Sequence, residues 1–140
     1  MFNKIYFMLN YFSRNKQESL TKHKFTFQIA NDFSKRYAES DKIKNKYNNR
    51  VPIICEIHHK DKKNISLDNT KYLVPIDLSV GQFLHIVRKR IKIEPEKALY
   101  IFTENYTLSP TSQLIGSLYD NHKNTDGFLY LLISCENTFG

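Results

Sequence analysis

A single strongly amphipathic helix constrains the fold of this chain more than any other feature of its sequence. Between Val80 and Ile91, apolar residues recur at intervals of three and four, so they share one face of a helix. Ser79, just before them, is a residue type that often caps a helix by accepting a hydrogen bond from a backbone N–H group. The sequence therefore predicts a helix over 78–91, LSVGQFLHIVRKRI, which must pack its apolar face on another element.

Short segments rich in β-branched and aromatic residues lie on both sides of this helix and are typical of strands. Pro52 stands near the start of the first of them, where a missing backbone N–H group costs least. An Asp-Gly turn opens the last. The predicted helices cover 33–47, 78–91 and 111–122, and the predicted strands lie within 50–57, 70–77, 97–103 and 123–135.

This order of helices and strands predicts an α+β fold. Elements of these lengths form one mixed, four-stranded sheet with a long helix across it. We expect a ubiquitin-like β-grasp, preceded by an N-terminal helical segment. The first two strands follow each other closely, so we expect them to pair in antiparallel fashion. The 140 residues suffice for one such domain, which we place at 33–140 together with its C-terminal tail.

Residues 1–32 differ in character and are predicted to form a partly flexible N-terminal extension. Its first part, MFNKIYFMLNYF (1–12), is aromatic and apolar. It is typical of an amphipathic segment that touches a membrane, of a weak secretory signal, or of a start codon assigned too early. The secretory signal is disfavoured because Asn10 and Tyr11 interrupt the apolar run. SRNKQESLTKHK (13–24) then has the composition of a polar linker.

The chain is basic, with 21 Lys and Arg residues against 14 Asp and Glu residues and a formal net charge of +7. This balance favours acidic partners such as anionic membranes or acidic peptides, and it is also what ordinary solubility requires. The basic run RKRIK (88–92) lies on a predicted helix and contains no interleaved aromatic residue, so nucleic acid is not an expected partner. No apolar stretch approaches the roughly 20 residues of a membrane-spanning helix.

No group of residues has the pattern of a catalytic site. His58 and His59 could form a metal pair, but adjacent residues at a strand end point to opposite sides, and no third ligand stands at metal-ligand spacing. Cys55 and Cys135 are far apart and have the character of buried, reduced thiols. The chain has no phosphate-binding glycine loop. We therefore expect a protein that is not an enzyme and holds no metal and no cofactor.

Two features are left without a place in the predicted core. Ile86 lies off the apolar face of helix 78–91, beside Arg90 one turn later. It belongs either to a wide buried stripe or to the floor of an exposed groove beside a cation. Gly140 follows the last apolar run after a few residues. A terminal glycine has no side chain to shield its carboxylate, so an enzyme could reach and activate that group.

Several stretches between Phe33 and Gly140 follow one another in a specific pattern. They read FSKRYAES, NRVPIICE, KYLVPIDLSVGQFLHIVRKRI, PEKALYIF, DGFLYLLIS and ENTFG. In this order they resemble the autophagy-related protein eight family of ubiquitin-like modifiers, whose animal members are the light-chain-three and GABA-receptor-associated-protein groups. An ending on an exposed glycine is similar to the apicomplexan members of this family.

The resemblance implies conjugation through Gly140. An activating enzyme would adenylate the terminal carboxylate, a conjugating enzyme would carry it as a thioester, and the acyl group would finally form an amide with phosphatidylethanolamine. The catalytic residues would belong to these partners. The two acyl chains of a phospholipid are enough for stable membrane anchoring. The protein would then be cytoplasmic and attached through lipid to autophagosomal membranes or, following the apicomplexan likeness, to the apicoplast outer membrane.

The resemblance also implies that the protein captures peptides carrying an aromatic residue, two variable residues and an aliphatic residue. Such a peptide would add a strand to a sheet edge, which by motif match is 71–75. Arg50, with Lys71 and Arg90, would meet acidic residues that flank the motif. The first pocket, for the aromatic residue, would comprise Glu39, Ile43, Pro52, Ile54, Lys71, Leu73 and Phe128. The second pocket, for the aliphatic residue, would comprise Tyr72, Val74, Pro75, Leu78, Phe83, Ile86 and Arg90. The alternative is an unconjugated peptide-binding adaptor on membrane or cytoskeletal surfaces.

Overall fold

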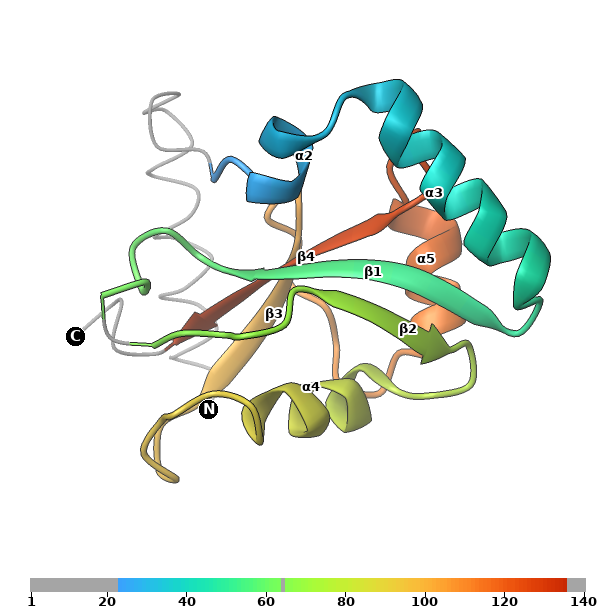
Figure 1. Cartoon of the computed structure of the whole chain (residues 1–140). Coiled ribbons are helices and arrows are strands. Elements are labelled where there is room, and N and C mark those ends of the chain that lie inside the picture. Colours follow the sequence, from blue (N-terminus) through green and yellow to red (C-terminus); the bar gives the residue numbers. More distant parts are fainter. Residues whose placement is uncertain (1–22, 64, 136–140) are drawn as a thin grey trace.

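One mixed sheet organises the part of the protein that the structure describes, residues 23–63 and 65–135 (Figure 1). In this computed structural model the strand order is β2-β1-β4-β3, with β1 and β4 parallel and the two outer pairs antiparallel. The strands are β1 (Arg50–Ile57), β2 (Lys71–Pro75), β3 (Leu99–Thr103) and β4 (Leu129–Cys135). The helices are α2 (Thr26–Ala30), α3 (Phe33–Lys46), α4 (Val80–Arg88) and α5 (Ile115–His122). The predicted ubiquitin-like sheet and the predicted N-terminal helical segment before it are confirmed.

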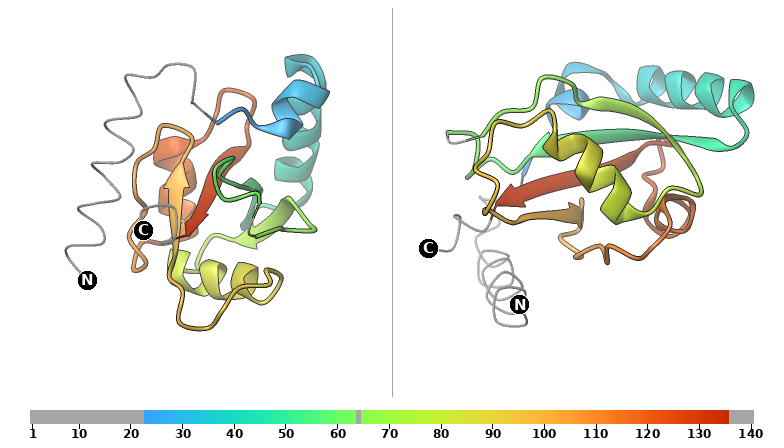
Figure 2. Two further views of the ribbon diagram at one scale, coloured as in Figure 1. Left: turned by 90° about the vertical axis from the view of Figure 1, so that its left-hand side faces the viewer. Right: turned by 90° about the horizontal axis from the view of Figure 1, so that it is seen from below.

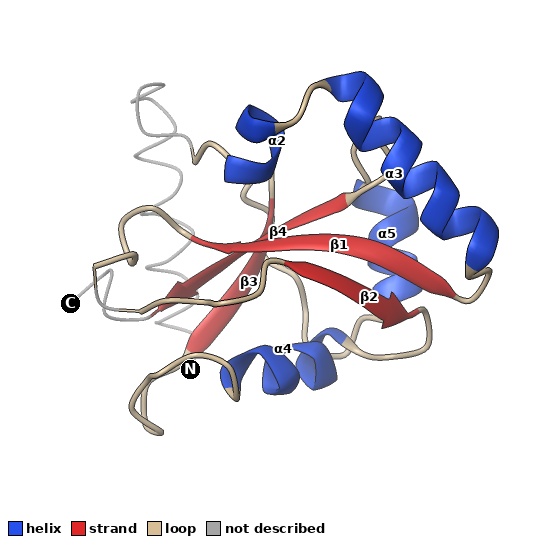
Figure 3. Ribbon diagram, viewed as in Figure 1, coloured by secondary structure: helices blue, strands red, loops and turns tan. Residues whose placement is uncertain are grey.

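Each face of the sheet carries its own apolar cluster. Alternation along β1 sends Ile53 and Cys55 to one face and Ile54 to the other. Buried residues of α4 and α5 complete the first cluster, and Phe25, just before α2, and Phe27, within it, complete the second. Figure 3 shows α4 on one side of the sheet and α2 and α3 on the other, and the two views of Figure 2 agree. β1, between β2 and β4, is buried along nearly its whole length.

The central helix begins as its sequence predicts and ends earlier. The Ser79 side chain accepts a hydrogen bond from Gln82 N at 3.1 Å, and the Gln82 side chain accepts one from Ser79 N, so the two form a capping box. α4 ends at Arg88, because the backbone then tightens into a turn in which Ile91 N donates to the Arg88 carbonyl at 3.3 Å. Ile91 stays buried in the first cluster, so its apolar role does not depend on being helical.

The N-terminal helical segment includes a short helix ahead of α3, which packs on the sheet and whose residues the sequence pattern does not locate. This helix, α2, has five residues and is therefore too short to show a helical period. Phe25 and Phe27 are buried around it, and their rings lie 5.0 Å from the rings of Tyr130 and Phe128 respectively. The end of the predicted extension is thus packed against the sheet. The division of the chain at residue 32 remains a prediction.

Two simpler expectations concern the thiols and the membrane. Cys55 and Cys135 are free and buried, as predicted, and burial raises the pKa of the Cys55 thiol. Within residues 23–63 and 65–135, no helix has the length and apolar character needed to cross a bilayer.

Candidate functional site

β2 lies at an edge of the sheet. It pairs with β1 from Lys71, opposite Ile54, to Pro75, opposite Arg50. The other side of β1 pairs with β4, and no further strand of the described chain pairs with the outer side of β2. Backbone N–H and C=O groups along such an edge can pair with an added strand. The sequence placed the candidate site on this strand.

Members of the predicted first pocket gather on the α3 side of β2. Leu73 lies opposite Pro52 and Lys71 lies opposite Ile54, so these four side chains share one face of the sheet. Lys71 Nζ lies 2.7 Å from Glu39 Oε1 in an exposed ion pair that joins α3 to the strand. The structure therefore brings residues from three elements together at this end of the edge.

These residues lie at different depths. Pro52, Ile54 and Phe128 are buried, whereas Ile43 and Leu73 are half-buried. An incoming side chain would meet the half-buried residues first. The buried ones can contribute only as a floor, and their main role is in the core.

The predicted second pocket lies on the opposite face, towards α4. The Tyr72 ring stands perpendicular to the Phe83 ring, with 5.3 Å between centroids. Val74 and Phe83 are buried and again form a floor. Burial raises the pKa of Tyr72 to about 12, with a contribution in the same direction from Cys55, while Arg90 acts in the opposite direction. The Tyr72 hydroxyl is therefore neutral at physiological pH.

The rim of the second pocket is more accessible. Ile86 is 40% exposed, so this surplus apolar residue of α4 reaches the surface and is not part of a wide buried stripe. Pro75 and Leu78 are half-buried, and Arg90 is exposed. Arg50, the residue predicted to meet an acidic flank, is exposed at the start of β1. An apolar surface with cations nearby suits a peptide with an aliphatic anchor and acidic neighbours.

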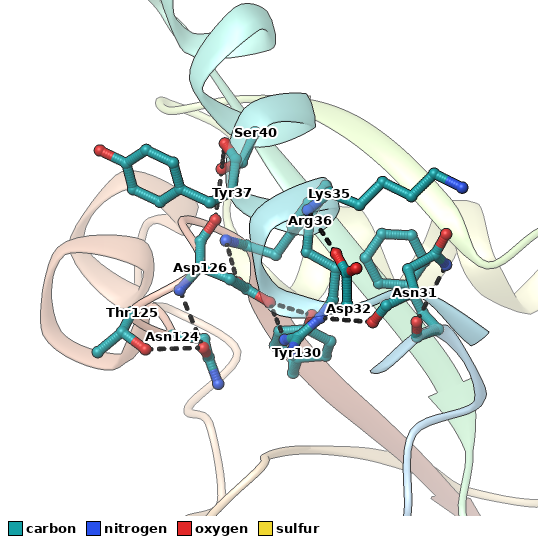
Figure 4. A network of polar contacts seen from close by, with 12 residues as sticks. Asn31, Asp32, Lys35, Arg36, Tyr37, Ser40, Asn124, Thr125, Asp126 and Tyr130 are labelled. Atoms are coloured by element: carbon teal, nitrogen blue, oxygen red, sulfur yellow. Dashed lines mark hydrogen bonds and ion pairs between the residues drawn. The ribbon is translucent and has the colours of Figure 1, made fainter. Parts of the chain in front are cut away.

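Asp126 joins α3, which carries two residues of the predicted first pocket, to β4 (Figure 4). Its buried carboxylate accepts hydrogen bonds from Arg36 Nη1 at 2.6 Å, from the Tyr130 hydroxyl and from Phe128 N at 2.9 Å. Its backbone carbonyl accepts one from the Ser40 hydroxyl. Two of these donors belong to α3, and a third, Phe128, is a predicted member of the first pocket.

The turn that carries this network requires glycine at its second position. Gly127 has φ of +90°, a conformation that L side chains rarely adopt. A Cβ atom at this position would lie 2.2 Å from Ser40 Oγ. The predicted Asp-Gly turn is confirmed, and its glycine also leaves room for the close approach of α3.

Glu56 holds α2 in an equivalent way. Its buried carboxylate accepts hydrogen bonds from Thr26 N at 3.1 Å and Phe27 N at 3.3 Å, and its Oε1 lies 3.1 Å from His23 Nε2. Burial by itself raises the pKa of Glu56, but these hydrogen bonds outweigh it, so the pKa lies below its ordinary value. Glu56 therefore stays ionised and anchors the start of the described chain to β1.

The expectation that His58 and His59 point apart is wrong. Their ring centroids lie 4.2 Å apart, because both residues follow the end of β1 and are no longer subject to strand alternation. The His23 ring, from the N-terminal segment, lies 6.1 Å from His58 and 5.9 Å from His59. Burial, with the charges of His59, His23 and Lys60, lowers the pKa of His58 to about 3. No group of three metal-ligating side chains in the described part of the chain is arranged to hold a metal.

Sequence reasoning missed the residues that hold the site in place. His23 and Phe27 stand in a segment without periodicity, and Glu56 is a single acidic residue in an apolar strand. The acid inside the apolar run was the available signal, because a buried carboxylate must have partners. Gly140 and the membrane-touching segment proposed for 1–12 lie outside the described residues.

The strand order and the helices on both faces define a ubiquitin-like protein with additional helices before its first strand. A family model described as "Autophagy protein Atg8 ubiquitin like" matches residues 35–140. The chain belongs to this Atg8 family.

Similar proteins of known family agree with this assignment. Autophagy-related protein 8 of Cochliobolus heterostrophus is 51% identical over 115 residues, covering 81% of this chain and 94% of the fungal protein. Autophagy-related protein 8 of Neurospora crassa is 50% identical over 115 residues, covering 81% and 93%. The crystal structure of Trypanosoma brucei ATG8 matches with a TM-score of 0.77 at 39% identity, covering 84% of this chain and all of that chain.

Proposed function

We propose that this protein is a ubiquitin-like modifier that is conjugated through Gly140 to phosphatidylethanolamine. On a membrane it recruits proteins that carry an aromatic residue, two variable residues and an aliphatic residue in sequence. The membrane is that of the autophagosome or, following the apicomplexan likeness, of the apicoplast. Membership of the Atg8 family and the open β2 edge are the observations that support this proposal.

The geometry of the edge suits this peptide pattern. In an extended peptide, residues three positions apart point to opposite faces and are separated by about 10 Å, at a rise of about 3.4 Å per residue. The residues predicted to form the first pocket lie on the α3 side of β2, and those predicted to form the second lie on the α4 side. A peptide paired with β2 would therefore present its aromatic residue to one pocket and its aliphatic residue to the other. Main-chain hydrogen bonds would supply affinity and the pockets would supply specificity.

The covalent step uses the protein as a substrate. The Gly140 carboxylate displaces pyrophosphate from ATP on an activating enzyme, a cysteine thiolate then displaces AMP, and transfer to a conjugating enzyme exchanges one thioester for another. The amine of phosphatidylethanolamine attacks the thioester carbonyl, so an amide forms and the cysteine thiol is released. Glycine suits these transfers because no side chain hinders attack on its carbonyl carbon.

Replacement of the terminal residue tests the proposal. Gly140→Ala is expected to leave the protein in the aqueous fraction of cells, whereas the parent protein divides between aqueous and membrane fractions. Ser112→Ala, a change at an exposed residue outside the site, is the matched control and should behave as the parent does. Membrane partitioning of Gly140→Ala equal to that of the parent would show that conjugation is not the anchor.

The alternative is an unconjugated adaptor that binds the same peptides on membrane or cytoskeletal surfaces. The net charge of +7 attracts the protein to anionic surfaces in general, and membranes and cytoskeletal filaments are among the surfaces that such an adaptor would use. The adaptor would bind these peptides with the same affinity as a lipid-conjugated modifier would, but it would never carry a lipid adduct. Peptide binding and adduct formation therefore separate the two functions.

A further inference from the structure

Three histidine rings from two parts of the chain meet beside the end of β1. His58 and His59 follow this strand, and His23 belongs to the N-terminal segment, residues 23–30, which includes α2. The centroid of the His23 ring lies 6.1 Å from that of His58 and 5.9 Å from that of His59. The His58 and His59 centroids are 4.2 Å apart. The contact between the N-terminal segment and the end of β1 therefore consists in part of titratable rings.

The loop after β1 adds positive charge around these rings. Burial lowers the pKa of His59, and neighbouring groups that carry or can carry positive charge act in the same direction. These groups are His23, Lys60 and Lys62. Asp61 acts in the opposite direction, but its carboxylate is buried and accepts two hydrogen bonds from the end of β4. A proton added to the pair at the end of β1 therefore meets mainly positive neighbours.

Glu56 and Tyr106 also face the cluster. Glu56 Oε1 lies 3.1 Å from His23 Nε2, so a proton on His23 is compatible with the bound position of the N-terminal segment. The Tyr106 hydroxyl accepts a hydrogen bond from His23 N at 2.6 Å, and the Tyr106 ring lies 6.1 Å from that of His58. Burial raises the pKa of Tyr106, so this hydroxyl stays neutral. Protonation of His58, by contrast, places a charge beside two other imidazoles.

Departure of the N-terminal segment would change the surroundings of His58. This residue is 2% exposed, and the His23 ring is stacked on its ring. Burial, with the neighbouring charges, holds the pKa of His58 at about 3, whereas an imidazole in water has a pKa of about 6.5. His58 therefore binds a proton more readily once the segment has left. Acidification below about pH 6.5 then shifts the equilibrium towards the released segment.

We propose that the three rings form a pH-sensitive contact through which acidification releases the N-terminal segment from the sheet. This release does not depend on conjugation or on peptide binding. It would uncover the rings of Tyr130 and Phe128, each of which lies 5.0 Å from a ring of the segment, Phe25 or Phe27 respectively. The Phe27 ring also lies 4.9 Å from Lys71 Nζ, a predicted member of the first pocket. Release would therefore also alter one side of that pocket.

Hydrogen exchange of the full chain at about pH 7.5 and about pH 5.5 tests the release. The amides of Thr26 and Phe27 report it, because both donate to Glu56. Glu56 keeps its charge at both values, because its pKa lies below the ordinary 4.5. After correction for the pH dependence of the intrinsic exchange rate, we expect the protection of these two amides to fall about three- to tenfold at the lower pH. Uptake of one proton with a pKa of about 6.5 in the released state provides a factor of up to about ten.

A low concentration of urea separates release of the segment from unfolding of the whole protein. Release exposes little surface, so the protection of Thr26 and Phe27 should respond weakly to urea. The amide of Cys55, which donates to the Thr70 carbonyl at 2.8 Å inside the sheet, should lose protection more steeply as urea is added. The two kinds of amide therefore report two different openings.

Matched variants assign the pH dependence to the rings. In the double variant His58→Gln with His59→Gln, the protection of α2 should be the same at both pH values, because neither residue can then take up a proton. His59→Gln alone, at a half-buried residue, disturbs the fold less and should lessen the fall in protection. His85→Gln removes an exposed imidazole from α4 and should behave as the parent does.

Three results would overturn the proposal. The first is equal protection of α2 at both pH values in the parent protein. The second is a fall of parental size in the double variant or, if that variant does not fold, in His59→Gln, because other groups would then drive release. The third is a dependence on urea as steep as that of Cys55, because acid would then act on the whole fold. Conjugation and peptide binding stand or fall separately from all three.

Discussion

Individual buried carboxylates fix the position of helices that make few apolar contacts with the core. Asp126 illustrates this, because its carboxylate and carbonyl bond to residues of α3 and β4 in one network (Figure 4). α3 itself has Ser40 as its one buried residue, so apolar packing contributes little to its position. The ion pair with Arg36, whose side chain is 14% exposed, takes that role.

Loss of the Asp126 charge should destabilise the protein. Asp126→Asn keeps the shape of the side chain but leaves the Arg36 guanidinium without its counter-ion, and breaking a buried pair in this way costs about 3 kcal/mol. Urea unfolding should report this loss, and peptide affinity should fall because α3 carries part of the first pocket. Asp120→Asn, at an exposed residue of α5, is the control and should change neither quantity. Unfolding of Asp126→Asn at the urea concentration of the parent would contradict this role.

The pKa of His58 predicts how stability depends on pH. In the folded protein this pKa is lowered to about 3, from an ordinary value of 6.5. As the pH falls from about 6.5 towards 3, His58 therefore binds a proton in the unfolded chain but stays neutral in the folded protein. The free energy of unfolding then decreases by at most about 1.4 kcal/mol per pH unit. His58→Gln removes this titration and should flatten the decline in urea stability between pH 7 and pH 5. His59, whose pKa burial also lowers, accounts for a remaining slope. An unchanged slope in the variant would contradict the assignment.

Among the elements, α2 shows that a segment with no apolar periodicity can still be held in one place by contacts with the rest of the protein. Its N–H groups at Thr26 and Phe27 are held by Glu56 of β1. Such a short helix is not stable by itself, so its conformation depends on tertiary contacts. That is why the sequence predicted α4, whose period and cap are local signals, and did not predict α2.

Removal of the Glu56 charge should release α2 without disturbing the sheet. In Glu56→Gln one amide N–H₂ faces a backbone donor, so a charge-assisted hydrogen bond worth about 1.5–3 kcal/mol is lost. Hydrogen exchange at the amides of Thr26 and Phe27 should accelerate about 10- to 100-fold. The amide of Cys55, bonded to the Thr70 carbonyl at 2.8 Å, should exchange as before. Glu94→Gln, at an exposed residue, is the control variant, and equal protection of α2 in both variants would contradict the account.

The sequence predicted that the candidate site lies along the β2 edge, but it did not predict how deeply each of the site residues is buried. Ile86 stood out because it lies off the apolar face of its helix, and it is indeed exposed. The likeness to the Atg8 family named Ile54 for the first pocket and Phe83 for the second, yet both residues are fully buried. The burial of a residue depends on which other elements pack over it, and the periodicity of its own strand or helix does not show this.

Half-buried residues at the edge should therefore carry most of the measurable effect on peptide binding. Leu73→Ala is expected to weaken binding of a peptide with both anchors by about 1–2 kcal/mol, because truncation removes contact area at the centre of the proposed interface. Leu114→Ala removes the same group from a residue that is 49% exposed and outside both pockets, and it should leave affinity unchanged. Equal affinity of Leu73→Ala and the parent, measured by fluorescence anisotropy on folded proteins, would show that the first pocket is wrongly placed.

At the scale of the whole molecule, the loop that follows β1 is bonded to the end of β4, the last described strand before the proposed site of conjugation. Asp61 Oδ2 accepts hydrogen bonds from Ser134 Oγ at 3.0 Å and from Cys135 N at 3.2 Å. β4 lies between β1 and β3, whereas peptide binding is proposed at β2 on the sheet's edge. In the sheet, β1 thus lies between the edge proposed to bind peptides and β4, the last described strand before Gly140.

Conjugation at Gly140 is the central claim, and intact mass spectrometry of the protein extracted from its native membranes tests it most directly. Fragmentation of the C-terminal peptide then locates any added mass. We expect a mass increase equal to phosphatidylethanolamine less one water molecule, on Gly140. Membrane-associated protein that carries only an unmodified Gly140 would contradict the account and would favour the unconjugated adaptor.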